Sequence, residues 1–146
     1  MASGIKKIVF LSLMLFFAFR VLAPDHRTLV ITEGTPVQPF RKLIQAIGMV
    51  ETKQDTFAYN PEEHAVGYFQ IRPIRLHDYN TRTGNDYSMK DLYNYHISEK
   101  IFLFYASGIG PYKFEEIAKK WNGSGEQTAL YWANVKSKLS LFQAVK

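Results

Sequence analysis

The segment from Phe40 to Glu51 has apolar residues at the spacing of one face of an α-helix. At about 100° per residue, Phe40 and Ile44 project within roughly 20° of Glu51, and Ile47 projects about 40° away. The apolar stripe of this segment therefore includes a carboxylate. An ionised side chain in such a place is costly unless it is paired, lies in a cleft or keeps its proton. Because a general acid must hold a proton near neutral pH, Glu51 is a candidate catalytic residue.

Apolar positions at helical spacing recur along the chain, and Gly or Pro residues separate the segments that contain them. The expected helices cover residues 39–55, 73–80, 88–106, 114–121 and 127–142. In the last of them we expect the core-facing residues to be Leu130, Tyr131, Val135, Leu139 and Phe142. The run 65–71 fits either a buried strand or a tight turn. These patterns predict a mainly α fold, α+β at most, with five or six helices and a small hairpin or turn region.

Composition limits both the size of the fold and its chemistry. The 146 residues, 47% hydrophobic and 15% aromatic, suffice for one substantial core but not for two ordinary domains. The chain has no cysteine, so its chemistry must come from carboxylates, histidines and hydroxyls. The spacing of His64, His77 and His96 matches no metal motif, and the chain contains no G-x-S-x-G. We therefore expect no metal, no cofactor and no serine nucleophile.

The amino-terminal residues have the features of an export signal. Two lysines precede the apolar run 8–19, and small or modest residues follow at 21–23. We expect residues 1–23 to be a signal peptide or, if Arg20 prevents cleavage, an amino-terminal anchor. Residues 24–36 contain Pro and Gly and are expected to form an extended leader. The protein is therefore expected to be exported, to the periplasm or the cell envelope.

The net charge of +5 depends partly on residues 1–23, which hold three of the 18 basic residues and none of the 13 acidic ones. The rest of the chain has 15 basic residues against 13, a net charge of +2. No stripe of Lys and Arg alternates with aromatic residues, which argues against a nucleic-acid partner. We expect a monomer that contacts a membrane only through residues 1–23, and only if that segment is not cleaved.

The order of several short motifs resembles the lysozyme-like transglycosylase family, which includes soluble lytic transglycosylase domains and goose-type lysozymes. A-I-G-M-V-E-T ends the first expected helix, and G-Y-F-Q-I follows at 67–71. W-N-G closes a later helix at 121–123, and Y-W-A-N-V lies beyond it at 131–135. The resemblance covers roughly residues 40–136. It implies that residues 37–146 form a lysozyme-like catalytic domain.

The resemblance implies a role for each matched residue. Glu51 would be the catalytic acid, and Thr52 stands where the family has Ser. Trp121 takes the place of a family Tyr and lacks the phenol that could hydrogen-bond the acid. The implied substrate-binding residues are Thr52, Gly67, Tyr68, Phe69, Gln70, Trp121, Asn122 and Tyr131. The sequence therefore supplies a candidate cleft but no clear hydrogen-bond partner for Glu51.

The implied activity is cleavage of the MurNAc–GlcNAc β-1,4 bond in the glycan strands of bacterial peptidoglycan. A lytic transglycosylase does this with one carboxylate and leaves 1,6-anhydromuramyl ends. A second carboxylate would instead favour a lysozyme-type hydrolase of the same bond. The candidates for a second carboxylate are Asp55, Glu62, Glu63 and Asp78.

A third alternative is a non-catalytic module that binds glycan or associates with the cell wall while keeping the same fold. For Glu51 itself the alternatives are a helix-surface residue on a rotated helix, or a buried structural acid paired with Lys53 or Arg72.

Overall fold

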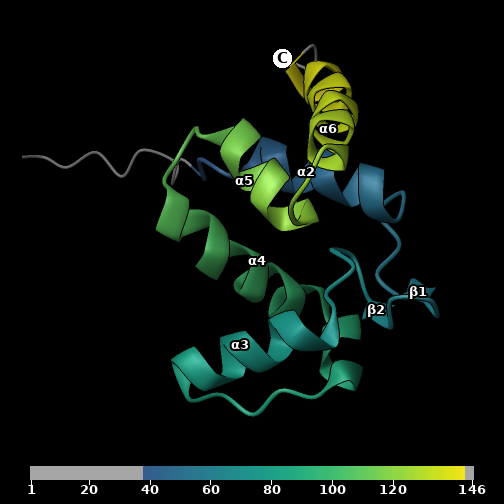
Figure 1. The fold of residues 1–146 in the computed structure, drawn as a ribbon, viewed down its shortest axis with the longest axis vertical. Coiled ribbons are helices and arrows are strands. Elements are labelled where there is room, and N and C mark those ends of the chain that lie inside the picture. The colour runs from purple at the N-terminus through teal and green to yellow at the C-terminus, as the bar shows by residue number, and fades with distance from the viewer. Residues whose placement is uncertain (1–37, 144–146) are drawn as a thin grey trace, which may run out of the picture. The chain divides into compact units, whose positions relative to one another are not determined.

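The computed structural model describes residues 38–143, which are mainly helical, as the sequence predicts (Figure 1). In chain order the elements are α2 (Arg41–Glu51), β1 (Tyr59–Asn60), β2 (Ala65–Val66), α3 (Pro73–Thr83), the 3₁₀ helix η1 (Met89–Tyr93), α4 (Tyr95–Ile109), α5 (Phe114–Asn122) and α6 (Gln127–Gln143). The described part of the chain thus has five α-helices, one 3₁₀ helix and a two-stranded antiparallel sheet. The predicted helix number and the small hairpin are confirmed.

The expected signal peptide or anchor and the extended leader lie outside the described residues. Within residues 38–143, no helix is both long enough and apolar enough to cross a membrane.

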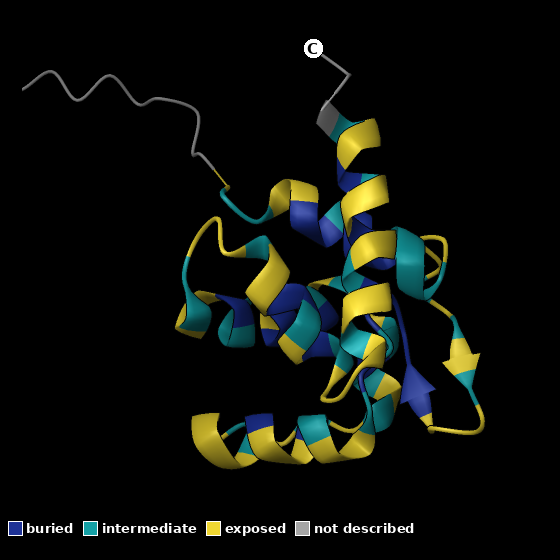
Figure 2. Cartoon of the chain, turned by 45° about the horizontal axis from the view of Figure 1, so that its top comes forward, coloured by how far each residue is buried: buried dark blue, intermediate teal, exposed yellow. Residues whose placement is uncertain are grey.

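Helix α6 packs against both α2 and α5, and Figure 1 shows these three helices together on one side of α4. The helices turn their buried residues inward and their exposed residues outward (Figure 2). Tyr131, Val135 and Leu139 of α6 are buried at intervals of four residues, as expected for one helical face. Leu130 was expected to be buried with them, but this prediction is wrong, because Leu130 is 67% exposed. It lies one position, about 100°, away from the buried face.

Helix α2 is shorter than the sequence predicts at both ends. It begins at Arg41 and ends at Glu51, whereas the expected helix ran from 39 to 55. Lys53 and Gln54 have positive φ angles of 57° and 71°, which no α-helix can include. The Gln54 N–H donates to the Gly48 carbonyl over 3.0 Å and closes the helix end. Glu51 is therefore the last helical residue, and the chain turns away directly beyond it.

The hairpin that follows combines the two alternatives open for residues 65–71. β1 pairs with β2 in antiparallel register, with Tyr59 opposite Val66. Val66 then forms an isolated bridge with Ile71, so the chain reverses through a tight turn between them. Gly67 begins this turn with a φ of 78°, and a Cβ atom there would lie 2.3 Å from the Leu92 carbonyl oxygen. A glycine is therefore required where the turn meets η1.

The helix expected over residues 88–106 is divided in two. Ser88 and Asp91 form the expected capping box, but it opens the short η1. Asn94 is extended and ends η1, and its side chain accepts a hydrogen bond of 3.0 Å from the N–H of His96 in α4. A second N-cap thus starts α4 where the sequence suggested one continuous helix.

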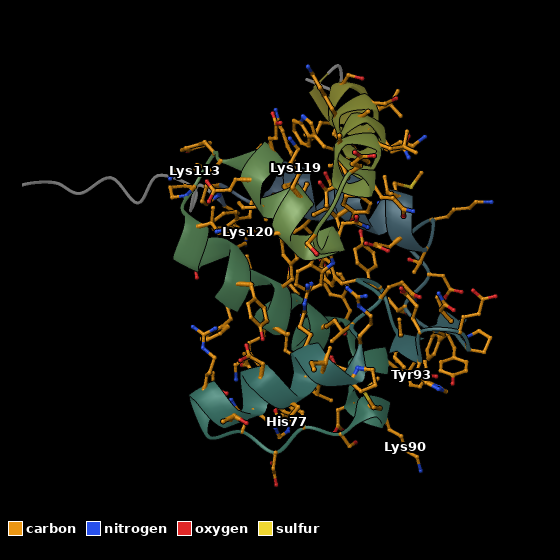
Figure 3. All side chains as sticks on the ribbon, viewed as in Figure 1. His77, Lys90, Tyr93, Lys113, Lys119 and Lys120 are labelled. Atoms are coloured by element: carbon orange, nitrogen blue, oxygen red, sulfur yellow. The ribbon has the colours of Figure 1, made fainter. Side chains whose placement is uncertain are left out.

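Helix α5 ends where the sequence predicts, at Gly123 with a φ of 137°. Lys119 and Lys120 lie at its carboxyl end and pair with Glu115 and Glu116 over 2.6 and 3.2 Å (Figure 3). These pairs span one helical turn and are exposed, so they stabilise the helix only modestly.

Candidate active site

Glu51 lies at the carboxyl end of α2, beside a tyrosine from the last helix. The Tyr131 hydroxyl of α6 donates a hydrogen bond to Glu51 Oε1 over 2.6 Å. Both side chains are largely enclosed, since Tyr131 is 9% exposed and Glu51 is half-buried. The packing of α2 against α6 brings the two groups together. The structure thus supplies the hydrogen-bond partner for Glu51 that the sequence left open.

The environment of Glu51 favours its protonated form. Burial raises the pKa of the Glu51 carboxyl from 4.5 to about 7, and the Tyr131 hydrogen bond and the charge of Arg75 oppose this rise. The negative charge of Glu63 raises the pKa further, and Arg72 lowers it. Desolvation is the largest of these effects. A carboxyl with a pKa near 7 can both donate and accept a proton at neutral pH.

Tyr131 is itself held in the phenol form. Burial, together with the neighbouring charge of Glu51 and the hydrogen bond to it, raises the Tyr131 pKa above its ordinary value. The phenol therefore remains a donor throughout the range in which Glu51 titrates. Because Oε1 accepts this bond, Oε2 is the carboxyl oxygen left to carry the proton.

Arg75 of α3 is the cation near Glu51 that the sequence analysis did not identify. Its guanidinium lies 4.0 Å from the centre of the Trp121 ring, and it also donates to the Lys120 carbonyl over 3.4 Å. Burial lowers the pKa of Arg75, although it stays far above neutrality. No sequence pattern marks this arginine, since its position depends on a tryptophan far along the chain.

Thr52 connects the end of α2 to the turn beyond the hairpin. Its hydroxyl lies 3.3 Å from both the Gly48 and the Tyr68 carbonyl oxygens, so it can donate to either. Gly48 lies under the Tyr68 ring, and a Cβ atom on Gly48 would come within 2.1 Å of that ring. Thr52 and Gly48 thus hold Tyr68 against the helix end that carries Glu51. Thr52 therefore positions this end of α2 by hydrogen bonding, and Gly48 does so by close packing.

The segment 67–71, expected to face the glycan, is mostly buried. Phe69 is fully buried and stacks on Phe102, so the prediction that its side chain contacts substrate is wrong. Tyr68 is 6% exposed and packs edge-on against Tyr95. Gln70 remains half-buried, and its amide donates to the Gly67 carbonyl over 3.1 Å. Gln70 is therefore the member of the segment with the most accessible polar side chain.

Trp121 and Asn122 connect α5 to the rest of the site. Trp121 is 5% exposed, and its indole N–H donates to the Phe69 carbonyl over 3.1 Å. The Asn122 carbonyl accepts a hydrogen bond of 3.3 Å from Arg72. Trp121 therefore fixes the 67–71 turn and carries Arg75 on its ring, and Tyr131 is the residue that hydrogen-bonds the acid.

The four candidate second carboxylates have different surroundings. Asp55 accepts from the Phe57 N–H over 2.8 Å, and it does not share a helix face with Glu51, because α2 ends before it. Asp78 is bound by the Tyr105 hydroxyl over 2.7 Å. Glu63 pairs with Arg72 over 3.5 Å and raises the pKa of Glu51.

The charge of Glu63 is among the main influences on the pKa of Glu51, and that of Glu62 is not. Arg72 pairs with Glu63 and not with Glu51. Lys53, the other partner considered for a structural Glu51, is exposed and forms no salt bridge within residues 38–143.

Within residues 38–143, no three histidine or carboxylate side chains are grouped closely enough to hold a metal ion. His77 lies on α3 at the edge of the molecule (Figure 3).

Comparison of the chain with protein-family models, with curated proteins and with solved structures finds no match in any of the three.

Proposed function

We propose that this protein is an exported lytic transglycosylase that cleaves the MurNAc–GlcNAc β-1,4 bond of peptidoglycan, with Glu51 as its acid and base. The observation that supports this most strongly is the hydrogen bond of 2.6 Å that Glu51 Oε1 accepts from Tyr131 at a half-buried position, where desolvation raises the pKa of the carboxyl to about 7. Within residues 38–143 Glu51 forms no salt bridge, and its hydrogen-bond partner is a neutral phenol. The motif order that resembles the family points to the same residue.

In the first step, protonated Glu51 donates its proton from Oε2 to the glycosidic oxygen as the bond from that oxygen to the anomeric carbon breaks. The leaving sugar departs as an alcohol, and positive charge develops at the anomeric carbon. Glu51 becomes a carboxylate, which the Tyr131 hydroxyl and the nearby charge of Arg75 stabilise. Because these groups are already in place, little reorganisation is needed when the charge forms.

In the second step, the Glu51 carboxylate accepts the proton of the muramyl 6-hydroxyl. The oxygen of that hydroxyl forms a bond to the anomeric carbon and closes the 1,6-anhydro ring. Glu51 is protonated again by the proton of the 6-hydroxyl, so the enzyme ends in its starting state. No water is consumed. A pKa near 7 serves both steps, because neither proton transfer is strongly uphill.

Hydrolysis of the same bond is the second candidate, and Glu63 is the observation that favours it. Its charge acts on Glu51, and a carboxylate near the acid could activate water. However, Glu63 forms an ion pair with Arg72. Glu63 is also exposed, so water screens its charge and weakens its electrostatic effect on a reacting group. The single-carboxylate reaction therefore fits the site better.

The proposal is tested by digesting purified peptidoglycan with the wild-type protein and with Glu51→Gln. Wild type is expected to release anhydromuropeptides, and Glu51→Gln is expected to lose about 10²-fold or more of this activity. Glu62→Gln is the matched control, because it removes an exposed carboxylate that is not among the main influences on the pKa of Glu51. Reducing ends in place of anhydro ends would identify a hydrolase. Wild-type protein that binds glycan without releasing products would identify the non-catalytic module.

A further inference from the structure

A second candidate site lies on the face formed by α3, α4 and α5. It is a pocket of about 490 Å³, within the size range of small-molecule sites. Glu51 is not among the residues that line it. Arg75 does line it and also acts on the pKa of Glu51, so the pocket adjoins the site of the proposed glycosidic reaction without containing the acid.

The charged side chains that line this pocket are all cationic: Arg75, Arg82 and Lys120. Arg82 pairs with Asp78 over 3.4 Å, and Lys120 pairs with Glu116 over 3.2 Å. Both pairs are exposed and therefore weak. Two of the three cations thus have a carboxylate partner, and the third gives the pocket wall an excess positive charge.

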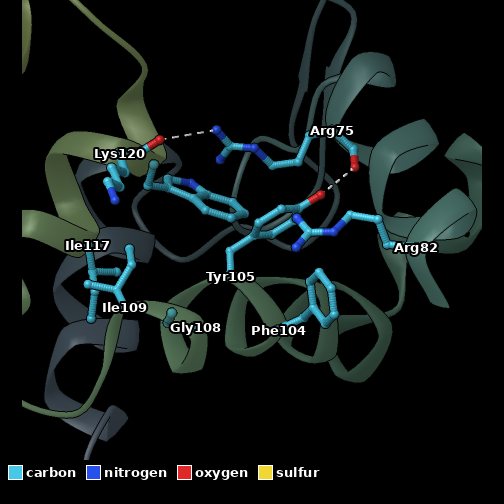
Figure 4. Close-up of a pocket in the computed structure, with 10 residues that line it drawn as sticks. Arg75, Arg82, Phe104, Tyr105, Gly108, Ile109, Ile117 and Lys120 are labelled. Carbon is cyan, nitrogen blue, oxygen red and sulfur yellow. Dashed lines mark hydrogen bonds between the residues drawn. The ribbon is translucent and has the colours of Figure 1, made fainter.

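That cation is Arg75, which forms no salt bridge within residues 38–143. Its guanidinium lies 4.0 Å from the centre of the Trp121 ring and 5.6 Å from the centre of the Tyr105 ring. Among the described residues, its one hydrogen bond is the 3.4 Å contact with the Lys120 carbonyl, drawn in Figure 4. A guanidinium has five N–H donors, so several remain to bind a planar anion. The aromatic rings fix the guanidinium in place before any ligand arrives.

The opposite side of the pocket is apolar. Figure 4 shows Gly108 and Ile109 across the pocket from Arg75, with Ile117 beside them. A ligand that fills the pocket would thus meet a fixed guanidinium at one end and aliphatic side chains at the other. An inorganic anion would use the first and leave the second empty.

We propose that this pocket binds an organic carboxylate with an apolar body, its carboxylate on Arg75 and its body against Ile109. Two sources share this chemistry. One is a free amphiphilic acid, and the other is the carboxyl end of a peptide.

The binding test uses the tryptophan in the pocket wall as the reporter. The chain has two tryptophans, so the variant Trp132→Phe leaves Trp121 as the single emitter. Trp121 emission is titrated with octanoate and with N-acetyl-leucine, which represent the two sources. The matched probes are 1-octanol, which lacks the charge, and inorganic phosphate, which lacks the apolar body. We expect saturable binding of at least one carboxylate, about 10-fold or more tighter than either matched probe.

Two variants locate the binding. Arg75→Gln is expected to weaken carboxylate binding about 10-fold or more, since it removes the charge. Gly108→Leu is expected to block the pocket without harm to the fold, because a Cβ atom on Gly108 meets nothing within 4 Å and glycine is unfavourable within a helix. Ser107→Leu is the control, because it adds the same side chain at an exposed neighbour outside the pocket.

Tighter binding of octanoate would identify a free acid as the ligand, and tighter binding of N-acetyl-leucine would identify a peptide end. Equal binding of 1-octanol or of phosphate would overturn the proposal. Undiminished carboxylate binding by a folded Gly108→Leu protein would also overturn it, because the ligand would then lie elsewhere.

Discussion

The Tyr131 hydroxyl and the Glu51 carboxyl are 2.6 Å apart, although 80 positions separate them in the chain. This hydrogen bond joins the end of α2 to the first turns of α6, the helix pair with the most extensive contact in the described fold. It lowers the pKa of Glu51, while burial of the same carboxyl raises it. Two opposed effects therefore determine the pKa of Glu51, and desolvation is the larger of them.

Tyr131→Phe removes the hydroxyl and keeps most of the packing. The Glu51 carboxylate then loses its donor, so its pKa is expected to rise and the alkaline limb of the pH–rate profile to move to higher pH. Loss of a hydrogen bond to a charged group predicts a fall of about 10- to 100-fold in kcat. A profile that keeps its shape and position would mean that the Tyr131 hydroxyl does not act on the catalytic group.

Glu63→Gln is expected to move the alkaline limb of the pH–rate profile to lower pH, opposite to the effect of Tyr131→Phe. The charge of Glu63 raises the pKa of Glu51, so its removal should lower that pKa and move the alkaline limb to lower pH. The pH–rate profile of Glu62→Gln, at the adjacent exposed position, should match wild type. If Glu63→Gln abolished activity at every pH, Glu63 would be a second catalytic carboxylate and the reaction would be hydrolysis.

Glu51→Gln should stabilise the protein at high pH and leave its stability unchanged at low pH. The folded-state pKa of Glu51 is raised above the unfolded value, so wild type loses stability as the pH rises from 4.5 to about 7. The loss approaches about 3 kcal/mol at pH 8, and a neutral glutamine avoids it. Denaturant unfolding at pH 4 and pH 8 measures the difference. A Glu51→Gln protein no more stable than wild type at pH 8 would show that the carboxyl is not desolvated.

Gly48→Ala should destabilise the site, because its Cβ would lie 2.1 Å from the Tyr68 ring. We expect a loss of about 2 kcal/mol or more in the free energy of unfolding. Gly108→Ala is the control, since it is also helical but meets no atom within 4 Å. Alanine there should stabilise the protein by about 0.5–1 kcal/mol. Equal effects of the two substitutions would contradict the close packing of Tyr68 on α2.

Local patterns made much of the fold predictable. The stop of α5 at Gly123 and the capping box at Ser88 depend on neighbours within a few residues, and both are present. The end of α2 was not predictable in this way. It depends on left-handed conformations at Lys53 and Gln54, residues that show no intrinsic preference for a positive φ.

The candidate site was predictable only as a set of separate residues. An apolar stripe marked Glu51, and the resemblance named Tyr131, but the sequence could not join them, because the contact depends on how α2 and α6 pack. Arg75 could not be predicted from the sequence for a similar reason, because its position depends on the Trp121 ring. Phe69 and Trp121 were expected to bind substrate because the resemblance matched them to family positions, yet aromatic residues also form cores, and both side chains are buried.

We propose that Glu51 cleaves the glycosidic bond by proton transfer alone, with the sugar's own hydroxyl as the nucleophile. Digestion of peptidoglycan in water enriched in heavy oxygen, followed by mass spectrometry of the released muropeptides, tests it most directly. Wild type is predicted to give anhydro products that contain no heavy oxygen, and Glu51→Gln is predicted to give almost no product. Heavy oxygen at the newly formed muramyl end in the wild-type digest would contradict the claim.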